Sequence, residues 1–209
     1  MADAAHWLGA WRELGVPDSP ELNRLYRDIL LRYSEPHRHY HTRQHLAECF
    51  EKVQDIIALA EHPAEVLVGL WFHDAIYDTR RHDNEQRSAD WARSAAGELG
   101  THAESARRIH DLILFTRHSA APVGVDAQVL VDADLSILGA PPARFQEYEA
   151  QVRSEYAWVP DEVFRSRRAA ILKELLGRSQ LYSTAHFQER YEAPARRNLQ
   201  QSLKDLEGS

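Results

Sequence analysis

Two scarcities limit the classes of protein to which this sequence can belong. Its 209 residues include one cysteine, Cys49, so the chain can form neither an internal disulfide nor a site built from several thiolates. No uninterrupted apolar run approaches the roughly 20 residues of a membrane-spanning helix. The opening residues, MADAAHWLGAWREL, also lack the basic segment and apolar core of a secretory signal peptide. We therefore expect a cytoplasmic protein with no membrane partner.

Basic residues are too few to form a broad cationic surface. The chain has 25 lysines and arginines against 32 acidic residues, a net charge of -7, which argues against an extended nucleic-acid surface. Hydrophobic residues make up 44% and charged residues 27%, as in ordinary globular proteins. Because this length can bury one sizeable core, we expect a single domain over residues 1–209.

Apolar residues recur with helical spacing along nearly the whole chain. Leu22, Leu25 and Ile29 follow Ser19 and Pro20, which together are a typical helix start. No segment of convincing length alternates with the period of a β-strand. The pattern predicts an all-α bundle of about nine or ten helices. The last two helices are expected over about 160–177 and 184–206.

The segment WFHDAIYD, residues 71–78, contains ionisable side chains within an apolar stretch. His73 and Asp74 follow the apolar part of a helix that we expect to begin at Pro63 and to continue through this segment. Burying an unpaired charge is costly, so something in the fold must compensate the pair.

Three further segments pair histidines or carboxylates within largely apolar or helical sequence. The pairs are His41 and His45 in YHTRQH, Asp132 and Asp134 in VDADLSILG, and His110 and His118 in HDLILFTRH. Taken alone, such a residue is more often solvent-exposed or hydrogen-bonded in the core. Taken together, imidazoles and carboxylates presented by separate helices favour a shared divalent cation, which would also neutralise the buried aspartates.

The order and context of these motifs resemble the HD superfamily of metal-dependent phosphohydrolases. The similarity is carried by HYHTRQHL, LWFHDAIYD, DNEQRSA and DADLSILG, and it continues into YEAPARRNL near the C-terminus. Within that superfamily the sequence resembles a bacterial group of uncharacterised predicted HD phosphohydrolases. The resemblance implies a helical fold with a metal-site core over roughly 36–140 and helices of 141–206 packed on it. It also implies hydrolysis of a small phosphate ester, often a nucleotide.

The resemblance also implies a ligand set for one divalent ion. Its members are His45, His73, Asp74 and Asp134. Asp132 competes with Asp134 for the last position, and Asp134 is preferred because it directly precedes the leucine of ADL. The ion itself can be Mn, Co, Ni, Zn, Fe or Mg. A second ion remains open, with His110 and His118 as its candidate ligands.

Three residues are candidates for acid–base roles. Asp78 lies one helical turn after Asp74 if that helix continues, and it would then position or deprotonate water; otherwise it is a solvent-facing carboxylate. His41 resembles the general acid of the related cyclic-nucleotide phosphodiesterases. Glu85 is a further candidate acid or base, or a first-turn carboxylate that complements the helix dipole.

Phosphate recognition requires cationic or hydrogen-bonding side chains. The candidates for this role are Arg43, Arg81, Thr116 and His118. A charged loop residue can equally be solvated without any binding role.

Two other functions remain open, besides a helical bundle with no site. A di-iron oxygenase of the HD type would need additional histidine ligands, and a nucleotide-binding module would keep the pocket without turnover. The sequence identifies neither the phosphorylated substrate nor the oligomeric state.

Overall fold

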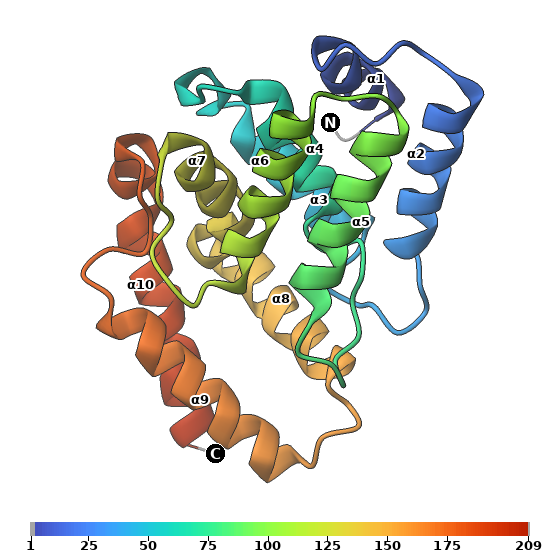
Figure 1. The fold of residues 1–209 in the computed structure, drawn as a ribbon. Coiled ribbons are helices and arrows are strands. Elements are labelled where there is room, and N and C mark those ends of the chain that lie inside the picture. The colour runs from blue at the N-terminus through green and yellow to red at the C-terminus, as the bar shows by residue number, and fades with distance from the viewer. Residues whose placement is uncertain (1–2, 209) are drawn as a thin grey trace. The chain divides into compact units, whose positions relative to one another are not determined.

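The computed structural model describes residues 3–208. Within that range the chain contains ten α-helices and no β-strand, which confirms the predicted all-α class (Figure 1). None of these helices combines the length and apolarity needed to cross a membrane. The chain divides after Asp134 into two compact units. The expected packing of the C-terminal helices on the metal-site core stays a prediction.

The first unit contains seven α-helices and two short 3-10 helices. They are α1 (Ala4–Glu13), α2 (Pro20–Arg32), α3 (Arg43–Val53), η1 (Ile57–Leu59), α4 (Pro63–Phe72), α5 (Asn84–Glu98), α6 (Ala103–Leu114), η2 (Phe115–Arg117) and α7 (Val125–Asp134). Helix α2 starts where its sequence predicted, since Pro20 is its first residue and the Ser19 Oγ accepts from the Leu22 backbone N–H at 3.1 Å.

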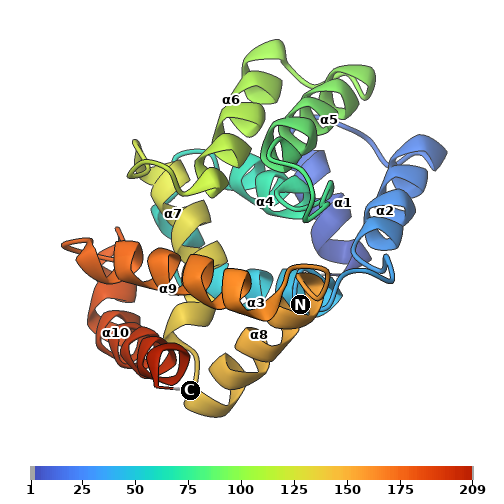
Figure 2. The same cartoon turned by 90° about the horizontal axis from the view of Figure 1, so that it is seen from below.

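Helix α4 is the central element of this unit. It contacts α1, α3, α5, α6 and α7, and Figure 2 shows it surrounded by them. Its sequence PAEVLVGLWF is apolar on nearly every face, the composition of a fully buried helix. Gly69 permits close packing, because a Cβ at this position would lie 2.8 Å from Leu130 Cδ1 of α7. The apolar sequence of α4 therefore brings its C-terminal end into the interior.

The second unit consists of η3 (Leu135–Gly139), α8 (Pro142–Glu155), α9 (Asp161–Gly177) and α10 (Ala185–Glu207). Helices α9 and α10 pack side by side (Figure 1). The Asn198 side chain of α10 donates to the carbonyls of Leu138 and Ala140, both at 2.8 Å, and so fixes the turn that leads into α8.

Candidate metal centre

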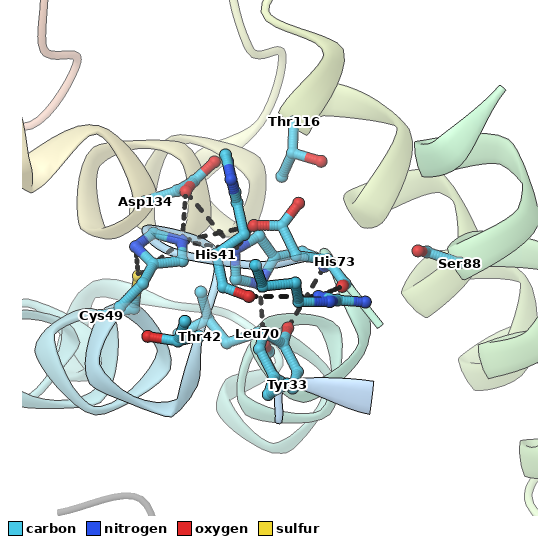
Figure 3. Close-up of polar contacts among 12 residues, drawn as sticks. Tyr33, His41, Thr42, Cys49, Leu70, His73, Ser88, Thr116 and Asp134 are labelled. Atoms are coloured by element: carbon cyan, nitrogen blue, oxygen red, sulfur yellow. Dashed lines mark hydrogen bonds and ion pairs between the residues drawn. The ribbon is translucent and has the colours of Figure 1, made fainter. Parts of the chain in front are cut away.

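Three separate parts of the first unit bring four ionisable side chains together. His45 lies in α3, whose start is capped by Thr42. His73 and Asp74 directly follow α4, and Asp134 is the last residue of α7. Figure 3 shows His73 and Asp134 close to each other, with Cys49 farther out to the left. Both histidines are buried and both aspartates are largely so.

The donor atoms of these four residues are separated by distances that a shared cation would produce. His45 Nε2 and His73 Nε2 lie 3.0 Å apart. Asp74 Oδ2 lies 3.4 and 3.1 Å from these two nitrogens, and Asp134 Oδ1 lies 3.3 and 3.4 Å from them. Ligands about 2.1 Å from an ion are about 3.0 Å apart at a right angle and about 3.4 Å apart at a tetrahedral angle. The separations therefore fit one common ion.

The orientation of His73 suits metal binding. Its Nδ1 lies 2.8 Å from the Leu70 carbonyl, to which it donates a hydrogen bond. In the neutral ring, the proton on Nδ1 leaves the Nε2 lone pair facing the cluster. Ligand histidines in metalloproteins are commonly fixed by such a bond from the other ring nitrogen.

The electrostatics of the cluster show a need for positive charge. Burial raises the pKa of Asp74, but His73 and His41 outweigh it and bring that pKa well below its usual value. Asp134 behaves alike, with burial opposed chiefly by His73. Conversely, burial lowers the pKa of His73, while Asp74 and other neighbours raise it well above its ordinary value. Two buried carboxylates thus hold protons on the imidazoles or attract a cation in their place.

Cys49 is a neighbour of this cluster that the sequence analysis did not include. Its buried Sγ lies 3.6 and 3.7 Å from the two ring nitrogens of His45. With His45, His73 and Asp134 it forms a group whose donor atoms all lie within 4.8 Å of one another, and this group could hold a metal ion. The available signal was its spacing, four residues after His45 on the same helix face.

Asp132, the competing last ligand, lies outside that group. It is fully buried in α7, two residues before Asp134. Residues two apart on an α-helix project about 200° from each other, so the two carboxylates take different directions. The structure brings Asp134 to the histidines.

Arg38, also absent from the sequence predictions, holds the backbone around the cluster. Its buried guanidinium donates to the carbonyls of Asp74 at 2.6 Å, Ala75 at 3.1 Å and His41 at 3.2 Å. The Asp74 backbone N–H donates in turn to the Tyr33 hydroxyl at 3.3 Å. No feature of the polar segment SEPHRH distinguishes Arg38 from a solvated arginine.

The premise that placed Asp78 near the cluster was wrong. Helix α4 ends at Phe72, and the Ile76 N–H, which a continuing helix would direct at the Phe72 carbonyl, donates instead to the Ser88 Oγ at 3.0 Å. The Asp78 N–H donates to Asn84 Oδ1 at 3.2 Å, and its carboxylate accepts from the Arg80 N–H at 2.9 Å. Asp78 therefore shapes a turn, and its role as a base stays a prediction.

His41 and Glu85, the other acid–base candidates, lie at helix starts. His41 precedes Thr42, the cap of α3, and so lies outside the helix that carries His45, although the two ring centroids are 5.8 Å apart. The His41 ring stacks on Tyr77 with centroids 4.1 Å apart. Glu85 lies in the first turn of α5, where a carboxylate complements the helix dipole. Their catalytic roles stay predictions.

The two candidate arginines differ in their surroundings. Arg43 is exposed at the first position of α3. Arg81 is engaged in a two-pronged ion pair with Asp83, at 2.7 and 2.6 Å. Phosphate binding by Arg81 would have to compete with this pair.

The candidates from the end of α6 also take different positions. Thr116 is buried, and its hydroxyl donates to the Ile113 carbonyl at 2.7 Å. His118 Nε2 lies 3.1 Å from Asp134 Oδ2, so this histidine contacts a candidate ligand directly. Substrate binding by either residue stays a prediction.

His110, the other histidine considered for a second ion, belongs to a separate set of contacts. Its Nε2 lies 3.3 Å from Asp90, and its Nδ1 lies 3.0 Å from Asp111. His110 and His118 therefore do not share a common partner among these contacts.

Comparisons with known proteins do not assign a family. No protein-family model, curated protein or solved structure matches this chain. The HD resemblance thus depends on the motifs alone, and the chemistry of the cluster must be argued from its geometry.

Proposed function

We propose that this protein is a metal-dependent phosphohydrolase that acts on a small phosphate ester, such as a nucleotide. One observation carries the proposal: two imidazoles and two carboxylates from three separate segments converge with donor separations of 3.0–3.4 Å. This arrangement agrees with the order of motifs that the sequence shares with HD phosphohydrolases.

The residues present fit one divalent ion. His45, His73, Asp74 and Asp134 would hold it, and this nitrogen and oxygen set suits Mn, Fe, Co, Ni or Zn, with Mg as a further candidate. When bound, such an ion polarises a phosphoryl oxygen and lowers the pKa of water to about 7. Cys49 offers an additional donor beside His45.

The surrounding residues prepare this site in three ways. Leu70 fixes the ring of His73, while Arg38 and Tyr33 fix the backbone at Asp74. His41 is partly exposed and its ring centroid is 5.8 Å from that of His45, so it lies at the edge of the cluster. From there its imidazole would donate a proton to the leaving oxygen of the ester.

The test is a panel of phosphate esters and nucleotides, assayed with a panel of divalent metals and elemental analysis of the purified protein. We expect phosphate release by the wild-type protein, and its loss together with bound metal in His73→Ala and Asp74→Asn. His62→Ala is the matched control, because this histidine contacts an aspartate, Asp126, at 2.9 Å on a different part of the unit. It should keep both metal and activity.

Unchanged metal content and phosphate release in His73→Ala would refute the proposal. Two irons with oxygen consumption would indicate an oxygenase instead. Tight nucleotide binding without product over long incubation would indicate a binding module.

A further inference from the structure

His118 adopts a backbone conformation that is unusual for its residue type. It ends η2 with φ 53° and ψ 17°, in the left-handed region. Among residues 3–208 it is the sole non-glycine with positive φ. Glycine is usual at such a position because it has no Cβ to clash with the backbone. A histidine here therefore suggests that its side chain has a role.

The side chain of His118 contacts the outer oxygen of Asp134. Its Nε2 lies 3.1 Å from Asp134 Oδ2. The other oxygen, Oδ1, faces the nitrogens of His45 and His73 at 3.3 and 3.4 Å. The two oxygens of one carboxylate thus have separate partners, one on the η2 side and one in the cluster.

This division matters because Asp134 is at the end of its helix. It is the last residue of α7, where the chain passes into a 3-10 helix. Without a second contact, its carboxylate can rotate and withdraw Oδ1 from the cluster. A donor on Oδ2 removes that freedom and leaves Oδ1 directed at the two imidazoles.

We propose that His118 is a positioning residue, which orients the Asp134 carboxylate for metal binding from the left-handed turn after η2. The inference depends on the metal site of the proposed function, but it does not depend on hydrolysis. Suitable variants separate the contribution of the His118 side chain to metal affinity from the effect of its left-handed backbone conformation.

The experiment measures Mn²⁺ and Zn²⁺ affinity of the metal-free full chain, together with urea denaturation of each variant. We expect His118→Ala to bind about 10- to 100-fold more weakly, the range for residues that orient metal ligands. His118→Gln should recover part of this loss, because its amide nitrogen can reach the place of Nε2 and donate to Asp134.

His118→Gly separates the two contributions. Glycine tolerates the left-handed turn, so the metal-free variant should unfold at a urea midpoint no lower than that of the wild type, while its metal affinity falls as in His118→Ala. His62→Ala is the matched control, since His62 contacts Asp126 instead of the cluster. Its metal affinity should equal that of the wild type.

Equal affinity in His118→Gly and the wild type would overturn the inference. So would a stoichiometry of two ions per chain that falls to one in His118→Gly, because His118 would then be a ligand. Absence of any binding to the wild-type chain would refute the metal site itself, a failure distinguishable from the other two.

Discussion

In the second unit the buried guanidinium of Arg168 lies against the carboxylate of Glu149 and donates to the Tyr148 hydroxyl at 2.8 Å. The Ser202 hydroxyl donates to the same carboxylate at 2.9 Å. In the first unit, by contrast, the carboxylates of Asp74 and Asp134 face imidazoles. One buried cluster contains a permanent cation and the other does not.

This difference separates a structural cluster from one prepared for a ligand. Arg168 stays charged, because Tyr148 and Glu149 raise its pKa against the opposing effect of burial. The charges of its cluster are therefore balanced within the chain. Histidine is charged only when protonated, so the cluster of the first unit is balanced by protons or by a metal ion.

Removing Arg168 from the buried cluster of the second unit should produce the largest loss of stability. Arg168→Ala leaves the largely buried Glu149 without its cation, and we expect a loss of about 3 kcal/mol in the free energy of unfolding. Urea denaturation measures this loss. The double variant Arg168→Met with Glu149→Gln should recover much of it, since no buried charge then remains. A loss below about 1 kcal/mol in Arg168→Ala would show that the pair is exposed to water in solution.

Removing a ligand from the other cluster should affect metal binding instead. We expect His45→Ala to weaken metal affinity by more than about 100-fold, equivalent to about 2.7 kcal/mol, because it removes a direct donor atom. Isothermal titration with Zn²⁺ measures the change. Arg168→Met with Glu149→Gln should bind Zn²⁺ as the wild type does. A matching loss in that double variant would contradict the separate roles of the two clusters.

The helices could be predicted from local sequence because their determinants are local. Helix α9 covers Asp161–Gly177 and α10 covers Ala185–Glu207, within one residue of the expected ranges. Apolar spacing and start signals determine such boundaries. The residues that meet in the cluster of the first unit were also identifiable, since each motif combines its ionisable residue with apolar or helical sequence.

The features that local sequence could not predict depend on contacts between residues far apart in the chain. At the end of α4, the Ile76 N–H that would continue the helix beyond Phe72 donates instead to the Ser88 Oγ, 12 residues further along the chain. Apolar periodicity cannot reveal such a contact, so the expected helical approach of Asp78 was wrong. Cys49 is visible in the sequence four residues after His45, but a single cysteine cannot form the several-thiolate site by which cysteine ligands are usually identified.

The loss of thermal stability on removing the metal ion with a chelator should depend on pH. Protons on the imidazoles of the cluster can take the place of the ion and balance the two carboxylates. In the metal-free chain the pKa of His73 is raised above its ordinary 6.5, chiefly by Asp74 against the effect of burial. Its protonation therefore contributes stability below pH 6.5, and this contribution disappears as pH rises through the higher folded-state pKa. Asp74, whose pKa is lowered from 3.8, stays charged throughout this window.

Chelation should consequently lower Tm more at pH 8 than at pH 6. Each kcal/mol corresponds to about 2–4 °C for a chain of this size. Differential scanning fluorimetry with and without a chelator measures the difference. His45→Ala should lose most of the metal-dependent shift at both pH values. An equal shift at pH 6 and pH 8 in the wild type would contradict proton–metal competition.

Replacing Cys49 should have the smallest effect on metal affinity if the nitrogen and oxygen atoms of His45, His73, Asp74 and Asp134 hold the ion. Its Sγ is almost equidistant from both ring nitrogens of His45, at 3.6 and 3.7 Å, so it lies along the ring rather than beyond Nε2 alone. Asp74 Oδ2 is closer to Nε2, at 3.4 Å. We therefore expect Cys49→Ser to change Zn²⁺ affinity less than tenfold, about 1.4 kcal/mol, and Asp74→Asn to change it more.

The absorption spectrum of bound Co²⁺ tests, without measuring affinity, whether Cys49 binds the ion. Co²⁺ bound to the wild-type chain should show no near-ultraviolet thiolate charge-transfer band if Cys49 stays outside the ligand set. Such a band, lost in Cys49→Ser, would contradict the ranking and place a soft donor on the ion. The cluster would then select Zn²⁺ or Co²⁺ over Mg²⁺ and Mn²⁺, because thiolates favour softer cations. The contrast with the Arg168 cluster would remain, because the cluster of the first unit contains no permanent positive charge with or without the Cys49 thiolate.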